Sequence, residues 1–296
     1  MATREIRQRG LTAPAQYRFS KVPRITIFFW VVKILTTAMG EAFADFMALN
    51  YSPVLAGVVG VTLFVLAMVL QFRARRYNAW IYWFAVSMVA VFGTLCADGL
   101  HIKLGIPYSV SSAFFAICLI VVFAAWYLAE GTLSIHSICT RRRELFYWAT
   151  VCATFALGTA VGDLTATTFG LGFLASGIMF TVAILVPGLA YWKFRLNAVV
   201  AFWTAYVLTR PLGASYADWM GVAHRYGGLD FGRGHVALYL TVVILGFVAY
   251  LAVTRVDVDH TEFRPGAGRA AAGVPSRGPA RGPVRGTARG GARHRR

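Results

Sequence analysis

Acidic residues are scarce in this chain, which has 12 Asp and Glu among its 296 residues. Charged residues of either sign make up 14% of it, whereas an average globular chain carries roughly a quarter. Patterns typical of catalysis are also absent. The sequence holds no Ser/His/Asp arrangement and no HExxH, and its four cysteines and six histidines lack metal-finger spacing. The scarcity of charge argues against a soluble globular domain, and the missing catalytic and metal-binding patterns lead us to predict neither an enzyme nor a bound cofactor.

Apolar residues, by contrast, are abundant. They make up 58% of the chain and gather in long runs such as Val54–Leu70 and Ala113–Ala129. Such runs approach the length of about 20 residues that crosses a bilayer as a helix, and they do not alternate as a membrane β-barrel requires. The sequence therefore predicts an all-α integral membrane protein whose partner is the lipid bilayer. Its eight transmembrane helices are expected at 25–47, 53–72, 78–98, 108–129, 145–165, 170–192, 197–219 and 235–254.

Basic residues predict the orientation of these helices. Of the 29 Lys and Arg, 24 lie before the first predicted helix, in the connections after the second, fourth and sixth, or after the eighth. Because basic residues are retained on the cytoplasmic side, we expect both termini in the cytoplasm. Residues 1–24 then form a basic cytoplasmic segment, residues 25–255 the membrane domain and residues 256–296 a cytoplasmic tail.

The predicted tail alternates Arg with Gly, Ala and Pro, and residues 264–296 contain nine Arg and no acid. A segment of this composition cannot bury a core, so we expect it to be disordered. Anionic lipid headgroups are its expected partner, at about 1 kcal/mol per basic residue near the surface. Nucleic acid is not expected, because the segment has no aromatic side chains for base stacking. The sequence makes no prediction of an oligomeric state.

The pattern W-x9-G-x4-D occurs four times, once in each odd-numbered predicted helix, beginning at Trp30, Trp83, Trp148 and Trp203. Four gapless copies indicate four tandem helical-hairpin repeats, at about residues 25–73, 78–130, 145–193 and 197–255. An even number of helices in each repeat keeps all repeats in one orientation, so the pseudo-symmetry axis should run along the membrane normal. The motif helices should then gather around this axis, with the second helix of each repeat facing lipid.

Two positions of the repeat have structural interpretations. The Trp lies about one turn inside the cytoplasmic end of its helix, which favours an interfacial anchor. The Gly favours close packing of neighbouring helices, and local unwinding at a binding site is the alternative. In the fourth repeat, Pro211 removes a backbone hydrogen bond and invites a kink. The predicted packing or flexing residues are Gly40, Gly93, Gly158, Pro211 and Gly213.

The Asp of the repeat falls near the outer end of each motif helix, as Asp45, Asp98, Asp163 and Asp218. Carboxylates at this end oppose the helix macrodipole, so helix propensity does not explain them. One interpretation is that each Asp caps the following turn through its free N–H groups. The other is that all four converge around the axis and form an acidic outer mouth, since ionisable residues within a membrane mark functional sites.

The first motif helix carries additional charge. One of its faces presents polar residues that recur every three to four positions, namely Lys33, Thr37, Glu41 and Asp45, with Thr36 beside them. Arg210 occupies the Thr37 position of the fourth repeat. Lys33 and Arg210 are expected to pair with acids as counter-charges, which a purely structural network also explains. The surplus of acids suits a cation or proton better than an anion, and no particular metal is predicted.

Two segments of the chain resemble a known family. The first contains Lys21-Val22-Pro23, Phe29-Trp30, Lys33 and Thr36-Thr37-x-x-Gly40-Glu41-x-x-Ala44-Asp45. The second reads Leu208-Thr209-Arg210-Pro211-Leu212-Gly213-Ala214-Ser215-x-Ala217-Asp218. Both are similar to motifs of a bacterial membrane-protein family of unknown function that is built of four short repeats. The resemblance covers about residues 20–255 and implies a multi-pass protein of the bacterial inner membrane, with no assigned activity.

Two functions of different classes follow from these patterns. The first is a small secondary transporter or channel for a cation or small polar solute. In this hypothesis Glu41 and the four repeated Asp residues bind the ion, Lys33 and Arg210 are counter-charges, and the hydroxyls of Thr36 and Thr37 line the pathway. The alternative is a non-transporting membrane scaffold or signalling anchor, in which the buried charges only hold the helices together.

Overall fold

A computed structural model of the chain describes residues 20–258. The predictions for residues 1–19 and for the tail beyond residue 258 lie outside the described residues. Eight long α-helices are present, and they agree with the eight predicted ones to within a few residues at each end. They are α1 (Ile27–Asn50), α2 (Pro53–Arg73), α3 (Ala79–Asp98), α4 (Tyr108–Glu130), α5 (Arg141–Asp163), α6 (Phe173–Phe194), α7 (Ala198–Gly221) and α8 (Arg233–Thr254).

The four helices that carry the repeated motif, α1, α3, α5 and α7, each begin at a polar N-cap residue. The side chains of Thr26, Asn78, Thr140 and Asn197 accept hydrogen bonds from backbone N–H groups in the first turns. Such caps satisfy donors that the helix itself leaves unpaired. Short polar segments between apolar runs therefore define where the motif helices start.

Seven helices of the described chain are long and apolar enough to cross a membrane, and α7 is the exception on hydropathy. With 24 residues, α7 reaches about 36 Å at 1.5 Å per residue, which is ample for a bilayer. Its hydropathy is lower because it carries several buried polar side chains, among them Thr209, Arg210, Ser215 and Asp218. The chain is thus a multi-pass, all-helical membrane protein.

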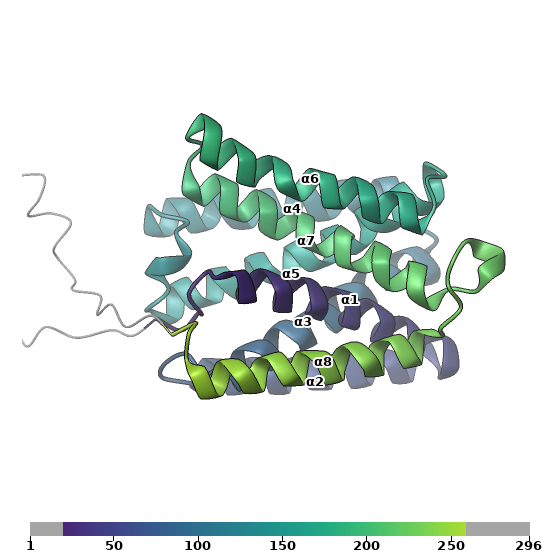
Figure 1. Ribbon diagram of the computed structural model, residues 1–296, viewed down its shortest axis with the longest axis horizontal. Coiled ribbons are helices and arrows are strands. Elements are labelled where there is room, and N and C mark those ends of the chain that lie inside the picture. Colours follow the sequence, from purple (N-terminus) through teal and green to yellow (C-terminus); the bar gives the residue numbers. More distant parts are fainter. Residues whose placement is uncertain (1–19, 259–296) are drawn as a thin grey trace, which may run out of the picture. The chain divides into compact units, whose positions relative to one another are not determined.

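The motif helices form a closed inner ring. In this ring α1 packs against α3, α3 against α5, α5 against α7, and α7 against α1. Figure 1 shows α2 and α8 along one side of these helices and α4 and α6 along the other. In the most apolar stretch of α1, α3 and α5, 61% of the residues are buried, against 22% in α2, α4 and α6 and 33% in α8. The motif helices therefore form the interior, and the second helix of each repeat supplies the apolar outer face.

Each outer helix packs mainly on the motif helix of the following repeat. The helix α2 covers α3, α4 covers α5, α6 covers α7, and α8 returns to cover α1. The two helices of one repeat are consecutive in sequence but make fewer contacts with each other. The predicted hairpins are therefore connected pairs of antiparallel helices rather than closely packed units.

The glycine of each repeat permits the close approach of neighbouring inner helices. A Cβ atom added to Gly40 would meet Ala90 of α3, and one added to Gly93 would meet Phe155 of α5. The same construction at Gly158 meets Arg210 and Pro211 of α7, and at Gly213 it meets Thr37 of α1. All four glycines thus make the same contact around the ring, which supports the packing interpretation. The unwinding alternative is wrong, because α7 stays helical from Ala198 to Gly221 through Pro211 and Gly213.

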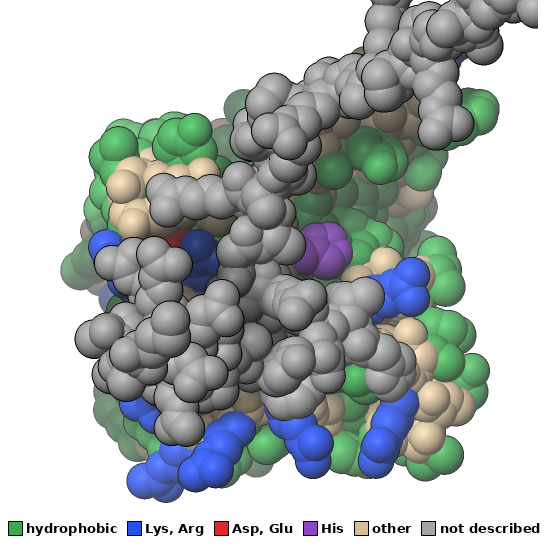
Figure 2. Space-filling view, turned by 90° about the vertical axis from the view of Figure 1, so that its left-hand side faces the viewer, with side chains coloured by type: hydrophobic (Ala, Val, Ile, Leu, Met, Phe, Trp, Pro, Cys, Tyr) green, Lys and Arg blue, Asp and Glu red, His purple; other side chains and the backbone are tan. Residues whose placement is uncertain are grey.

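The N-terminal ends of the motif helices, together with residues 20–26 and 255–258, form one end of the bundle, here called the basic end. Figure 2 looks onto this end and shows Lys and Arg side chains gathered on it. Just inside it, the side chains of Trp83, Trp148 and Trp203 are buried among the helices. The prediction of interfacial anchors is therefore wrong for these three residues, because they pack against other aromatic rings of the ring interior.

Candidate functional site

The centre of the inner ring is occupied by the fully buried side chain of Arg210. Its Nη2 atom donates hydrogen bonds to Glu41 Oε2 of α1 and to Thr159 Oγ1 of α5, both at 2.7 Å. The same nitrogen also contacts Thr94 Oγ1 of α3, and Nη1 donates to the backbone oxygen of Thr37 at 3.0 Å. One guanidinium group therefore connects all four inner helices.

The partners of Arg210 occupy one position of the repeat. Glu41, Thr94 and Thr159 each follow directly after the motif glycine, and the fourth repeat has Ala214 there. Both threonine hydroxyls also donate to Glu41 Oε2, at 2.9 and 3.3 Å. A buried guanidinium is stable only when its charge is paired and hydrogen-bonded. The repeat thus builds a polar layer from three equivalent side chains, and the fourth helix completes it with Arg210.

The two predicted counter-charges, Lys33 and Arg210, have different kinds of partner in the structure. Arg210 pairs with Glu41 at 2.7 Å, as expected. Lys33 does not pair with an acid of the described chain. Its Nζ atom lies 4.0 Å from the ring centre of Phe155 and 4.3 Å from that of Tyr206, and it donates to Thr209 Oγ1 at 3.2 Å. The prediction that Lys33 neutralises an acid is therefore wrong, because at the depth of Lys33 the neighbouring helices α5 and α7 present the aromatic rings of Phe155 and Tyr206.

The hydroxyls of Thr36 and Thr37 do not line a pathway. Both residues are fully buried. Thr36 Oγ1 donates to Lys33 O at 2.9 Å, and Thr37 Oγ1 lies at 2.6 Å from Ile34 O of its own helix and at 3.2 Å from Thr209 O of α7, so both hydroxyls bond to backbone oxygens. The hydroxyls that face the polar layer belong to Thr94 and Thr159 instead.

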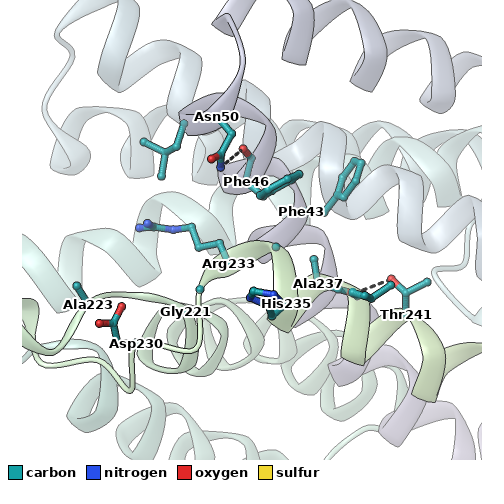
Figure 3. A pocket seen from close by; sticks show the side chains of 14 residues that line it. Phe43, Phe46, Asn50, Gly221, Ala223, Asp230, Arg233, His235, Ala237 and Thr241 are labelled. Carbon is teal, nitrogen blue, oxygen red and sulfur yellow. Dashed lines mark hydrogen bonds between the residues drawn. The ribbon is translucent and has the colours of Figure 1, made fainter.

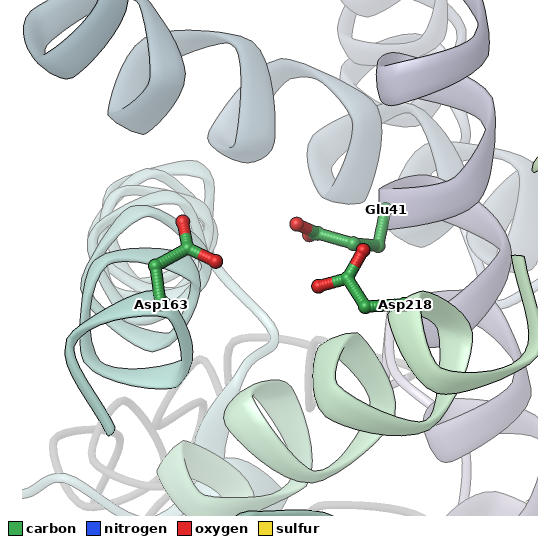
Figure 4. Close-up of side chains that lie close together, drawn as sticks. All are labelled: Glu41, Asp163 and Asp218. Carbon is green, nitrogen blue, oxygen red and sulfur yellow. The ribbon is translucent and has the colours of Figure 1, made fainter. Parts of the chain in front are cut away.

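The repeated acids converge beyond this layer, at the end of the bundle opposite the basic end. Carboxylate oxygens of Glu41, Asp163 and Asp218 all lie within 4.8 Å of one another, and Figure 4 shows the three side chains pointing into the space between α1, α5 and α7. Asp45 lies near enough to Asp218 and Glu41 to interact with their charges, and Asp98 lies similarly near to Asp45 and Asp163. These five residues, Glu41, Asp45, Asp98, Asp163 and Asp218, are called the acid cluster below.

The capping interpretation of the repeated Asp residues is wrong. The backbone continues as a π-helical turn after Asp98 (Gly99–Lys103) and after Asp163 (Leu164–Thr168), and neither carboxylate caps that turn. Asp45 and Asp218 lie within α1 and α7, which end several residues later. Single π-helical turns of this kind are frequent at functional sites. The four carboxylates therefore do not satisfy helix ends.

Charge compensation in the acid cluster is incomplete. Glu41 is paired with Arg210, and Asp45 Oδ2 accepts a hydrogen bond from Nε of Arg233, at the start of α8, at 2.7 Å. Within residues 20–258, no basic side chain forms an ion pair with Asp98, Asp163 or Asp218. Three neighbouring carboxylates without basic partners are electrostatically costly unless a proton or a cation joins them.

Beside the cluster, a pocket of about 660 Å³ opens between α1, the start of α8 and the connection from α7. Figure 3 shows Arg233 and His235 on its α8 side and Phe46 and Asn50 on its α1 side. Arg233 also pairs with Asp45, so this one side chain contacts both the pocket and the acid cluster. Sequence reasoning did not single out Arg233, although it is one of few basic residues predicted on the outer side.

Two further polar groups were missed from the sequence, and both lie toward the basic end. Glu144 is fully buried and pairs with Lys21 at 2.6 Å and with Gln71 Nε2 at 3.1 Å. The hydroxyls of Tyr82 and Tyr147 share a hydrogen bond of 2.5 Å. The signal for the tyrosines was present, because an aromatic residue precedes the motif Trp in all four repeats.

The fold and this polar interior define a class of protein: a multi-pass membrane protein made of four tandem repeats. The chain belongs to the family described as "Repeat of Unknown Function (DUF347)", which matches residues 28–77, 81–132, 146–197 and 201–257. The predicted resemblance to a family of four short repeats of unknown function is thereby confirmed. No curated protein and no solved structure matches the chain.

Proposed function

We propose that this protein is a small secondary transporter for a cation, which binds at the acid cluster. The observation that carries the proposal is the convergence of the carboxyl groups of Glu41, Asp163 and Asp218, with Asp45 and Asp98 close by. Only two of these five groups, those of Glu41 and Asp45, are paired to arginines among the described residues. Carboxylate oxygens are the ligands that hard cations such as Mg²⁺, Ca²⁺ and Mn²⁺ prefer. The three clustered residues Glu41, Asp163 and Asp218 supply such oxygens from three different helices.

The arrangement around the cluster supports transport rather than simple storage of an ion. Ion sites of repeat-built transporters lie within the membrane at the interface between repeats. Here the polar layer around Arg210 lies between the cluster and the basic end. Aromatic residues fill the bundle between that layer and the basic end. The positive-inside bias favours a cytoplasmic basic end, and with that orientation the cluster would load from the outer side.

Uptake by the purified full-length protein in proteoliposomes tests the proposal. With Mn²⁺ as the probe, we expect uptake well above that of protein-free vesicles, and a loss of about tenfold or more in Asp163→Asn and Asp218→Asn, since each removes one ligand charge. Asp230→Asn is the matched control, because Asp230 lies in the α7–α8 connection at φ 58°, which Asn also adopts.

Wild-type uptake rates in both cluster variants, with the proteins still folded, would show that the acids are not the ion site. Loss of folding in both variants, with no Mn²⁺ binding to the wild type in electron paramagnetic resonance titrations, would instead favour the scaffold function. In that case the Arg210–Glu41 pair and its threonines would serve only to hold the ring together.

A further inference from the structure

The interior between Arg210 and the basic end contains a column of ionisable side chains that the cation site does not use. Lys33 lies at the end of the column nearest Arg210. It is 1% exposed and has no acid partner in the described chain. An ammonium group in such a place is usually paired. Here it is stabilised only by the rings of Phe155 and Tyr206 and by the Thr209 hydroxyl, while the nearby charge of Arg210 repels it.

From Lys33 the column continues through tyrosine hydroxyls. Tyr206, whose ring touches Lys33, is fully buried, and its hydroxyl lies close enough to Tyr147 to interact with it, although outside standard hydrogen-bond geometry. The Tyr147 and Tyr82 hydroxyls lie 2.5 Å apart. The rings of Tyr82 and Tyr77 are in edge contact, with their centroids 5.6 Å apart. Tyr77 precedes the start of α3 and therefore lies outside the membrane-spanning helices.

The column ends at a carboxyl group on the basic end. The Tyr77 hydroxyl hydrogen-bonds to Asp257 Oδ2, just beyond the end of α8. Burial raises the pKa of the Asp257 carboxyl above its ordinary value, while the hydrogen bond from Tyr77 acts in the opposite direction. A carboxyl group whose pKa is raised exchanges protons closer to neutral pH than an ordinary Asp does.

We propose that Lys33, Tyr206, Tyr147 and Tyr82 form a proton pathway between the ring interior and the Tyr77–Asp257 pair, which couples cation transport to proton movement. In one passage the Lys33 side chain turns from the face of the Tyr206 ring toward the Tyr206 hydroxyl, and the proton that leaves its ammonium forms a new bond to that oxygen. Rotations that bring the Tyr206 hydroxyl to Tyr147 and the Tyr82 hydroxyl to Tyr77 then let the proton relay proceed. Tyr206 passes its own proton to Tyr147, Tyr147 to Tyr82, Tyr82 to Tyr77, and Tyr77 to the Asp257 carboxylate. Each hydroxyl gains one O–H bond and loses another, so the only net changes are a neutral amine at Lys33 and a protonated Asp257.

The coupling arises from electrostatics and rests on the proposed function. A cation bound at the acid cluster adds positive charge on the far side of Arg210, which favours the neutral form of Lys33. The groups that face Lys33 are Arg210, Tyr206 and Thr209 from α7 and Phe155 from α5. None of them is an acid that would hold the proton in place. Arg210 itself stays charged, because a guanidinium does not lose its proton in proteins.

Proteoliposomes that contain a trapped pH-sensitive dye test the pathway during Mn²⁺ uptake by the full-length protein. We expect proton movement with the wild type, and a reduction of at least about tenfold in Tyr147→Phe and in Lys33→Arg, which keeps the charge but cannot release a proton. Mn²⁺ binding, measured by electron paramagnetic resonance, should remain in Tyr147→Phe. The matched control is Tyr216→Phe, which removes a hydroxyl contact of 3.0 Å between α7 and Thr181 of α6, away from the column.

The outcomes separate this proposal from the proposed function. Mn²⁺ uptake without proton movement would overturn the pathway and leave the transporter standing. Proton movement that needs Tyr147 but occurs without any Mn²⁺ uptake would support the pathway and overturn the cation transporter. Proton movement that is equal in the wild type, Tyr147→Phe and Tyr216→Phe would overturn the pathway. Absence of both fluxes in the wild type would overturn both.

Discussion

At the scale of single residues, Arg210 is the side chain on which the inner ring depends most. From its place on α7 it bonds to the other three motif helices, α1, α3 and α5, and its side chain is not exposed at all. The three acceptors around it come from equivalent positions of three repeats. Arg210, which occurs only in the fourth repeat, therefore holds the first three repeats together.

Removing the partner of Arg210 should destabilise the protein strongly. In Glu41→Gln the buried guanidinium loses its counter-charge, and we expect a loss of about 3–5 kcal/mol in the free energy of unfolding. The double variant Glu41→Gln with Arg210→Met should recover much of this loss, because no uncompensated charge remains. Thermal unfolding in detergent, monitored by circular dichroism, measures both variants. Equal stability of wild type and Glu41→Gln would mean that the ion pair contributes little.

At the scale of helices, the glycine contacts make a prediction about packing. Gly93→Ala places a Cβ atom against Phe155 of α5, and we expect a loss of stability of about 1–3 kcal/mol from overpacking. Gly246→Ala, inside α8, is the control, because a Cβ there meets nothing within 4 Å and Ala favours the helix. Thermal unfolding of the two variants should therefore shift in opposite directions, and a similar shift in both would argue against close packing at Gly93.

The helices themselves were largely predictable from the sequence. Continuous apolar runs define where a chain can cross a bilayer. The predicted bounds of the helices therefore differ from the observed ones by only a few residues. The largest shifts have local causes. The Thr140 cap starts α5 before its apolar run, and the positive φ of Gly172 delays the start of α6. The association of α2, α4 and α6 with the following repeat was not predictable, because the hydropathy of a lipid-facing helix does not depend on which neighbour it covers.

The candidate site was predictable in part. Repeat spacing located the four Asp residues of the cluster, because helices related by pseudo-symmetry place equivalent residues at the same depth, and the polar face of the first motif helix located Glu41. The environment of Lys33 was not predictable, since it depends on the rotation of α5 and α7 toward α1. The pairing of Asp45 with Arg233 was not predictable either, because it depends on how the connection from α7 returns to α1.

At the scale of the whole molecule, the charge distribution predicts its orientation in the membrane. In a variant whose native cysteines are replaced by serine, Arg225→Cys lies in the α7–α8 connection and Arg75→Cys in the α2–α3 connection. Both positions are exposed in the structure. We expect a membrane-impermeant maleimide to label Arg225→Cys in intact cells and to label Arg75→Cys only after lysis. The reverse pattern would place the acid cluster on the cytoplasmic side.

The closure of the ring between the first and last repeats has a consequence for biosynthesis. Glu41 and Arg210 are 169 residues apart in sequence, and ribosomes add about 5–20 residues each second. For a time on the order of ten to thirty seconds, therefore, the nascent first repeat holds a carboxyl group whose guanidinium partner has not yet been made. During that interval α1 also lacks α8, its main outer cover. A chain that stops before the fourth repeat keeps both deficits permanently, so completion of translation is itself the step that makes the protein stable in the bilayer.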